Sequence, residues 1–202
     1  MNKIILIGGG GHCKSVIDVI EQEARFQIAG IVDKPELLGT KVLGYPVIGN
    51  DFDLEILAKK YHYSLITVGQ IKSSLLRIKL FDLAYKAGFT LPSIISPRAY
   101  VSKHSKIGQG TIIMHHAIVN SNAKIRDNCI VNSKALIEHD VVIGNHCHIS
   151  TGTIINGNCK IKDEVFIGSG TICKHGITIG QKVIVNAGKY VDSNISSNSF
   201  LK

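Results

Sequence analysis

An aliphatic residue recurs at every sixth position between residues 95 and 191, and this period constrains the fold more than any other feature of the chain. All members of the series are Ile or Val except one, which is Cys173. The series is Ile95, Val101, Ile107, Ile113, Val119, Ile125, Val131, Ile137, Ile143, Ile149, Ile155, Ile161, Ile167, Cys173, Ile179, Val185 and Val191. A period of six fits neither a helix nor an alternating strand. It is typical of a hexapeptide β-helix, in which each hexad supplies one short strand and one corner.

Three hexads complete one triangular coil, so residues eighteen positions apart are expected to stack on successive coils. The Ile or Val points into the prism, and a smaller residue two positions earlier, such as Ala117 or Ala135, packs beside it. Gly or Asn often follows the Ile or Val, as at Gly144 and Asn156, and we expect this residue to take the bent backbone of the corner. The pattern alone leaves the handedness of the coil open.

The residues before the repeat alternate between strand-like and helix-like patterns, which indicates a small parallel sheet. Apolar runs predict strands over 3–7, 27–32 and 64–68, with a further segment at 45–48. Helices are expected to about residue 25 and over about 51–60 and 73–87. The predicted fold is therefore a small Rossmann-like α/β domain over 1–92, of roughly three strands and three helices, and an all-β parallel β-helix domain over 93–202.

Composition favours a soluble, intracellular chain, and the cysteines described below fit a reducing cytoplasm. No apolar run reaches membrane length, and the start MNKIILIGGGGH is typical of a strand and turn rather than a signal peptide. Four of the five cysteines, at 129, 147, 159 and 173, fall on interior columns of the repeat, so a disulfide framework is not expected. The net charge of +8 is spread along the chain, which fits a solvated surface or attraction of phosphorylated ligands. Few aromatic residues occur in the repeat, so nucleic acid is not an expected partner. A membrane is not expected either, because no apolar run is long enough.

A glycine-rich turn, Gly8-Gly9-Gly10-Gly11, separates the first predicted strand from the first predicted helix. Such a turn can cradle a phosphate with its backbone N–H groups and the helix dipole. Asp33 ends the second predicted strand, which is where a Rossmann-type site places its ribose-binding carboxylate. The unit is too short for a full dinucleotide fold and better suits a nucleotide-sugar ligand, although a purely structural turn remains the alternative. His12, at the start of the helix, is by itself more typical of a surface residue.

Ionisable residues concentrate in the repeat at Glu138-His139-Asp140, followed by His146 and His148. His139 lies two residues beyond an inward Ile, so its ring is expected to project outward from a corner. Gly157, eighteen residues on, should stack above it and leave an open slot with a backbone N–H. A general base beside an amide donor is what acyl transfer requires, and Asp140 or Glu138 would hold the other ring nitrogen.

A zinc site is the rival interpretation of the nine histidines. The carbonic anhydrases that share this repeat use three histidines, two of them five residues apart, and no pair here has that spacing. No metal is therefore expected. His175, thirty-six residues beyond His139, lies on the same edge and is either part of a groove or a solvated corner residue.

Three features together resemble a known family: the segment IILIGGGGHCKSVIDVI, the hexapeptide repeat, and the segment VNSKALIEHDVVIGNHCHISTGT. They are similar to the bacterial sugar acetyltransferases of the sialic acid O-acetyltransferase type. This group includes the UDP-4-amino-sugar N-acetyltransferase of bacillosamine synthesis. The resemblance implies a nucleotide-sugar domain joined to a left-handed β-helix, acetyl-CoA as co-substrate, and a homotrimer with active sites between neighbouring subunits.

The resemblance also implies roles for individual residues. His139 would be the general base, Asp140 would orient it, and Gly157 would offer the oxyanion amide. The expected substrate-binding residues are Gly8, Gly9, Gly10, Gly11, His12, Asp33, Gly69 and Asn132, and the expected coenzyme A residues are His148, Ser169 and Ala187. Asn132 and His148 would line the region of the acceptor and the acetyl thioester. Arg77 also matches a family position, but three extra residues separate it from Gly69.

The predicted function is an acetyl-CoA-dependent N-acetyltransferase that acts on a nucleotide-linked amino sugar, with a UDP-4-amino sugar as the expected substrate in bacterial surface-glycan or glycoprotein synthesis. The mechanism would be direct attack with a histidine base. One alternative is O-acetylation of sialic acid or a related sugar. Another is a non-catalytic trimeric binding or assembly module, which the absence of the family's usual Gly-x-Pro-Ala-Lys ending at Ser199–Lys202 would favour.

Overall fold

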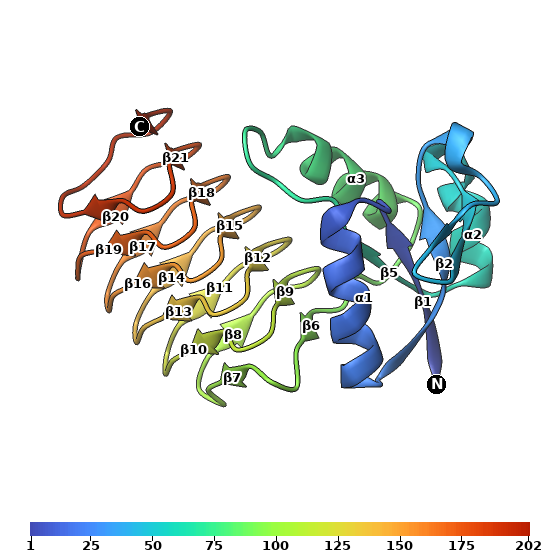
Figure 1. Ribbon diagram of the computed structural model, residues 1–202, viewed down its shortest axis with the longest axis horizontal. Coiled ribbons are helices and arrows are strands. Elements are labelled where there is room, and N and C mark those ends of the chain that lie inside the picture. Colours follow the sequence, from blue (N-terminus) through green and yellow to red (C-terminus); the bar gives the residue numbers. More distant parts are fainter. The chain divides into compact units, whose positions relative to one another are not determined.

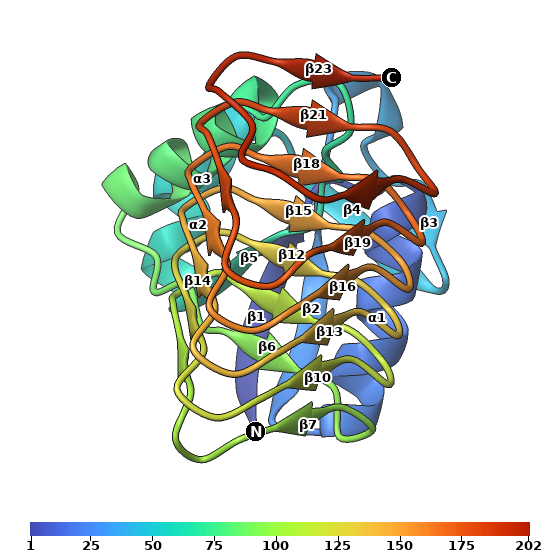
Figure 2. The ribbon, with the colours of Figure 1, turned by 90° about the vertical axis from the view of Figure 1, so that its left-hand side faces the viewer.

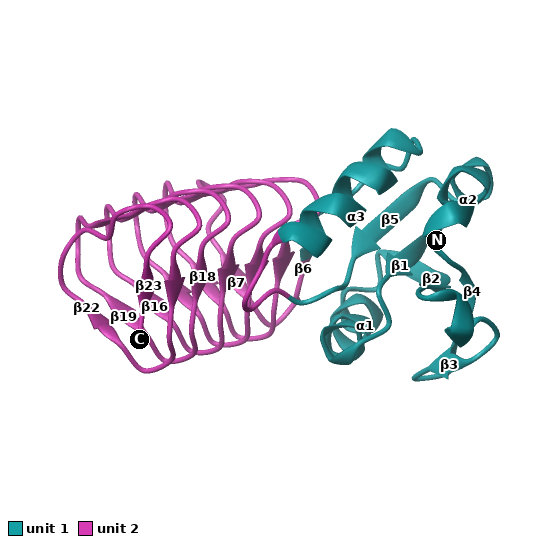
Figure 3. Ribbon diagram, turned by 90° about the horizontal axis from the view of Figure 1, so that it is seen from above, with its two compact units in different colours: residues 1–69, 75–94 teal, residues 70–74, 95–202 magenta.

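The computed structural model describes residues 1–202, which form two compact units (Figure 3). Unit 1 consists of Met1–Gly69 and Leu75–Ile94, and unit 2 consists of Gln70–Ser74 and Ile95–Lys202. The short segment Gln70–Ser74 therefore belongs with the β-helix, although both of its flanks belong to the α/β unit. No periodic pattern in the sequence indicates this membership.

Unit 1 contains a five-stranded sheet with the order β3-β4-β2-β1-β5. The strands are β1 (Asn2–Ile7), β2 (Phe26–Val32), β3 (Lys41–Val42), β4 (Tyr45–Gly49) and β5 (Tyr63–Ile66). The predicted parallel sheet is confirmed for β1, β2, β4 and β5, but the expected three strands were too few. β3 is antiparallel to β4, and the two are joined by Leu43 and Gly44, both with positive φ, as in a type I′ hairpin.

The helices of unit 1 are α1 (Gly11–Glu23), α2 (Leu54–Lys60) and α3 (Leu75–Lys86), with 3-10 turns at Pro35–Leu37 and Asp51–Asp53 (Figure 1). None of these helices is long and apolar enough to cross a membrane. α1 forms because Cys13, Val16, Ile17 and Ile20 recur at helical spacing and are buried. Its first turn has no side-chain cap, so its N-terminal N–H groups follow directly on the glycine turn.

Unit 2 is a parallel β-helix whose coils stack in three sheets (Figures 1 and 2). One sheet contains β6 (Ile94–Ile95), β9 (Ile112–Ile113), β12 (Ile130–Val131), β15 (His148–Ile149), β18 (Phe166–Ile167), β21 (Ile184–Val185) and β23 (Phe200–Leu201). A second contains β7 (Tyr100–Val101), β10 (Ile118–Val119), β13 (Leu136–Ile137), β16 (Ile154–Ile155), β19 (Ile172–Cys173) and β22 (Tyr190–Val191). The third contains β8 (Lys106–Ile107), β11 (Lys124–Ile125), β14 (Val142–Ile143), β17 (Lys160–Ile161) and β20 (Thr178–Ile179). The predicted stacking is confirmed, because Val119 pairs with Ile137 and Ile137 with Ile155.

The interior of the prism is one apolar core. From Ile113 to Val191 every Ile or Val of the six-residue series is buried, as are the small residues beside them, such as Ala117 and Ala135. Each such aliphatic side chain contributes about 1.5–3 kcal/mol through burial. All five cysteines are free and buried, and they act here as small apolar residues.

The bend of each corner lies at a different position from the one expected. The left-handed residue stands three positions after the Ile or Val rather than directly after it, as in the series Gly110, His116, Asn122, Asn128, Lys134, Asp140, His146, Gly152, Asn158, Glu164, Gly170, Gly176, Lys182 and Gly188. Glycine directly after the aliphatic residue serves close packing instead. A Cβ on Gly144 would lie 2.2 Å from Asp163 Oδ1 and 2.7 Å from Asp163 N on the next coil.

Gly144→Ala is therefore expected to lower the free energy of unfolding by about 1–3 kcal/mol, because the added carbon overpacks against the backbone of the next coil. The change is measured by urea denaturation. Lys162→Ala, an exposed residue on the same corner column, is the matched control and should change the free energy of unfolding by less than about 0.5 kcal/mol. Equal effects of the two substitutions would contradict the packing role of Gly144.

Candidate active site

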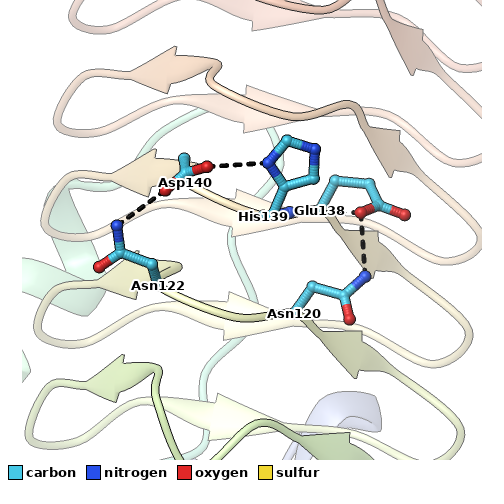
Figure 4. A network of polar contacts seen from close by, with 5 residues as sticks. All are labelled: Asn120, Asn122, Glu138, His139 and Asp140. Atoms are coloured by element: carbon cyan, nitrogen blue, oxygen red, sulfur yellow. Dashed lines mark hydrogen bonds and ion pairs between the residues drawn. The ribbon is translucent and has the colours of Figure 1, made fainter.

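His139 and Asp140 form a hydrogen-bonded pair on an exposed corner of unit 2 (Figure 4). Asp140 has a φ of 61°, and His139 Nδ1 lies 2.8 Å from Asp140 Oδ2. Asn122, one coil earlier, donates from Nδ2 to Asp140 Oδ1 at 2.7 Å. The hydrogen bond from His139, followed by that from Asn122, holds the pKa of Asp140 below its usual value. The carboxylate is thus ionised and accepts a hydrogen bond from the Nδ1–H of His139. Nε2 of the same ring is left as the acceptor nitrogen.

Asp140, rather than Glu138, is the carboxylate that holds the ring of His139. Glu138 Oε2 instead accepts a hydrogen bond from Asn120 Nδ2 at 3.0 Å and from the backbone N–H of His139 at 3.3 Å (Figure 4). The sequence left either Asp140 or Glu138 as the partner of the His139 ring. The left-handed backbone of Asp140 places its carboxylate beside the ring and decides between them.

Gly157 stacks on His139 as expected from the eighteen-residue spacing. A Cβ on Gly157 would lie 2.7 Å from both Nε2 and Cε1 of the His139 ring, so the absence of a side chain leaves room for the imidazole. The φ of Gly157 is not positive, so space rather than backbone conformation requires glycine here. Its N–H makes no hydrogen bond within the protein. His175 lies one coil beyond Gly157 and two coils beyond His139, and the centroids of the two histidine rings are 6.3 Å apart.

Gly157→Ala is expected to lower the rate of a reaction in which His139 acts as general base by about 10²-fold, because the new methyl group occupies the space of His139 Nε2. The added methyl group meets only the exposed ring of His139, which can rotate away, and no backbone, so the melting temperature should change little. Steady-state kinetics and a thermal melt check the two parts. A normal rate in the folded variant would contradict the importance of this gap.

A second pair of predicted residues meets on another corner of unit 2. Asn132 Nδ2 lies 3.3 Å from His148 Nε2, and the two residues come from neighbouring coils. His148 is buried, with its ring edge-on to Phe166 at a centroid distance of 5.3 Å. The structure also places Gln70 against this pair, a residue that sequence reasoning missed because it lies outside the repeat.

Ser169 and Ala187 lie eighteen residues apart and are exposed on one corner column. Gly188 N donates to Ser169 O at 2.8 Å, and the hydroxyls of Ser169 and Ser150 are 2.9 Å apart. A Cβ on Gly168 would lie 2.5 Å from the Ala187 nitrogen, so this corner presents backbone with little side-chain cover. The role of these two residues in holding coenzyme A stays a prediction.

In unit 1, the remaining predicted residues share a cavity of about 440 Å³. Its lining includes Gly8, Gly9, Gly10, Gly11, His12, Asp33 and Gly69. Gly8 has a φ of 103°, and a Cβ there would lie 2.4 Å from Val68 Cγ2, so this position requires glycine. Gly10 and Gly11 have open space where a Cβ would stand. The cavity therefore meets bare backbone at the N-terminus of α1, an arrangement that suits a phosphate.

Asp33 holds the glycine turn in shape. Its Oδ2 accepts from Gly9 N at 2.5 Å and its Oδ1 from Lys34 N at 2.8 Å. A second cavity of about 480 Å³ shares Gly8 and Asp33 with the first and extends to Leu80 of α3. Both volumes fall in the range of small-molecule sites.

Arg77 is almost fully buried, and its Nη1 donates to Ile66 O and Val68 O at 2.8 Å. The guanidinium thus braces the carbonyl groups that follow β5. Arg77 therefore stabilises the backbone that follows β5 in unit 1. The role that the family resemblance implies for Arg77 stays a prediction.

Cys13, Cys147 and Cys173 are poor nucleophiles in this structure. Burial raises the pKa of Cys13 to about 11 and that of Cys173 to about 12, and it raises the pKa of Cys147 well above its ordinary value. These thiols stay protonated near neutral pH, which disfavours a covalent acyl-enzyme. No group of three or more His, Cys, Asp or Glu residues is arranged to hold a metal ion.

Two family models match the chain. The PglD N-terminal domain matches residues 3–82, and the GMPPB C-terminal domain matches residues 86–177. No curated protein matches the sequence.

Solved structures match nearly the whole chain. Perosamine N-acetyltransferase from Caulobacter crescentus, a His-to-Asn variant in complex with CoA and GDP-perosamine, is 31% identical with a TM-score of 0.92, and the match covers 99% of this chain and 93% of that chain. The acetyltransferase domain of PglB from Neisseria gonorrhoeae, in complex with acetyl coenzyme A, is 31% identical with a TM-score of 0.91 and coverages of 99% and 96%. This chain belongs to the bacterial sugar acetyltransferase family.

The family assignment confirms the predicted enzyme class and the predicted fold, an α/β domain joined to a left-handed β-helix. WeeI from Acinetobacter baumannii, 23% identical with a TM-score of 0.75 and coverages of 99% and 96%, agrees in fold. Within this family, the arrangement of His139, Asp140 and Gly157 fits acyl transfer by direct attack, because it provides an oriented base, an exposed acceptor nitrogen and a nearby amide donor.

Proposed function

We propose that this protein transfers the acetyl group of acetyl-CoA to the amino group of a nucleotide-linked sugar. The observation that carries the proposal is the His139–Asp140 pair facing Gly157, in a chain 31% identical to an enzyme solved with CoA and GDP-perosamine. The glycine-turn cavity supports a nucleotide-linked substrate rather than a free sugar, because a free sugar offers no phosphate to the N-terminus of α1.

In the proposed reaction, His139 Nε2 is the proton acceptor. Asp140 keeps the Nδ1 proton in place, so the imidazole presents an unprotonated nitrogen to the substrate amine. As the amine nitrogen bonds to the thioester carbonyl carbon, its proton passes to Nε2. The carbon–sulfur bond then breaks, and His139 returns the proton to the departing thiolate of coenzyme A. The Gly157 N–H would stabilise the negative charge on the carbonyl oxygen.

The nucleotide sugar is proposed to bind across the two adjoining cavities of unit 1. The N–H groups of Gly8 and Gly9 already donate to Val32 O and Asp33 Oδ2, so Gly10, Gly11 and the N-terminus of α1 would hold phosphate. The second cavity, lined by apolar residues such as Leu76, Leu80 and Leu83, would take an uncharged part of the nucleotide. Asn132, His148, Ser169 and Ala187 are proposed for acetyl-CoA and the acceptor group.

The test is release of thiol from acetyl-CoA in the presence of UDP- and GDP-linked 4-amino sugars and of free sialic acid. We expect release with a nucleotide sugar, and a loss of about 10²–10⁴ in rate in His139→Ala, since a general base commonly contributes that factor. His104→Ala, an exposed histidine on another corner, is the matched control and should retain the wild-type rate. Release with sialic acid alone would favour O-acetylation, and no release at all would favour a non-catalytic assembly module.

A homotrimer is proposed as the working form of the enzyme. The outward residues of one sheet form an apolar stripe, defined as Tyr100, Ile118, Leu136, Ile154, Ile172 and Tyr190, which pair in register along the whole β-helix. Tyr100 and Tyr190 are 59% and 64% exposed. The corresponding residues of the β8–β20 sheet are mostly lysine. Exposed apolar stripes of this length typically mark interfaces, and His139 lies on the corner that follows the stripe.

Ile172→Glu is expected to convert the trimer to monomer, because it buries a charge in the proposed interface. Native mass measurement gives the result directly. Thr178→Glu places the same charge on the next strand of the same coil, on the polar face, and should leave the trimer intact. A wild-type monomer, or equal behaviour of the two variants, would contradict the proposed interface.

The cytoplasm is the proposed location. All five cysteines are free and buried, which suits a compartment that keeps thiols reduced.

A further inference from the structure

Gln70 makes two hydrogen bonds to the β-helix on either side of Cys147. Its side-chain Nε2 donates to His146 O at 2.9 Å, and its backbone O lies 2.5 Å from His148 Nδ1. Gln70 is 3% exposed, and its contact with His148 is buried while that with His146 O is partly buried. One residue from outside the repeat thus contacts both the backbone just before β15, at His146, and the ring of His148, the first residue of β15.

The surrounding hydrogen bonds determine which ring nitrogen of His148 carries the proton. Ser133 N donates to Asn132 Oδ1 at 2.8 Å, which turns the Asn132 NH₂ group toward His148. An NH₂ group only donates, so His148 Nε2 is the acceptor. The proton of the neutral ring therefore lies on Nδ1 and is donated to Gln70 O.

The side chain of Gln70 is held at a cost. Its Oε1 is buried and has no hydrogen-bond partner. Leaving a buried acceptor without a donor is unfavourable, so the arrangement is not the one that stability alone would select. At the other end of the segment, Ser74 Oγ donates to Glu164 Oε2 at 2.9 Å, which provides a separate anchor.

We propose that Gln70 is a positioning residue that holds His148 in the Nδ1–H tautomer, so that Nε2 accepts the hydrogen bond of the Asn132 amide. Asn132 is bound through Oδ1 and one N–H, so its second N–H has a fixed direction and is available to a substrate carbonyl or hydroxyl. The catalytic part of this inference rests on the proposed function, in which Asn132 and His148 line the site of the acetyl thioester. Gln70 directly follows Gly69, which lines the cavity of unit 1.

The test uses Gln70→Met in the full-length protein. Methionine keeps the length of the side chain and removes the donor to His146 O, so the Gln70 peptide loses its anchor. Two-bond ¹H–¹⁵N correlation spectra report the tautomer of each histidine, and His148→Asn identifies the signals of His148 by their loss. Ser74→Ala is the matched control, because it releases the other end of the same segment without touching the histidine.

We expect the wild type and Ser74→Ala to show His148 as a single Nδ1–H tautomer, and Gln70→Met to show a mixture of tautomers. The value of kcat/KM for acetyl-CoA should fall by roughly 10–10²-fold in Gln70→Met alone, with a near-normal melting temperature. An Nε2–H tautomer in the wild type, or an unchanged spectrum in Gln70→Met, would overturn the proposal. If the spectra show the expected tautomers but the wild type transfers no acetyl group, the result would support the positioning contact and contradict the proposed function.

Discussion

Parallel hydrogen bonding between successive coils is the interaction on which unit 2 depends. Each short strand donates to and accepts from the strand eighteen residues away, so Val119, Ile137 and Ile155 stack in one column and the corners stack with them. Strands paired in this way lie about 4.8 Å apart, which leaves little room above any corner. The spacing explains why the His139 ring, which lies against the next coil, needs a glycine at position 157.

The same ladder produces the chemistry of the corner. From Gly110 to Gly188 a left-handed residue stands three positions after each aliphatic residue of the series, and at one corner that residue is Asp140. The bend turns its carboxylate back onto His139, while Asn122 from the coil below holds its second oxygen. The oriented imidazole is thus a consequence of corner geometry, in which each coil supplies one partner. The glycine turn of unit 1 is held by a side chain instead of by stacked coils: Asp33 Oδ2 accepts a hydrogen bond from Gly9 N.

Much of the fold was predictable because its pattern is periodic. A β-helix places the aliphatic residues of a six-residue repeat in its interior, and the buried columns at Ile137 and Ala135 follow from it. The stacking of Gly157 on His139 was predictable for the same reason. The corner bend was misplaced because glycine after an aliphatic residue was interpreted as a turn residue, whereas at Gly144 it provides room for the next coil. The strand β3 was missed because two residues carry too little pattern.

The sequence by itself determined the β-helix, the eighteen-residue stacking, the glycine turn and the membership of the family, since each depends on residues at fixed spacing. Only the tertiary structure decided which carboxylate holds His139 and which nitrogen of His148 carries a proton. Those outcomes depend on side-chain direction and on contacts made by a segment outside the repeat, at Gln70. Such contacts have no period in the sequence, because they join a segment that precedes the repeat to residues of one of its coils.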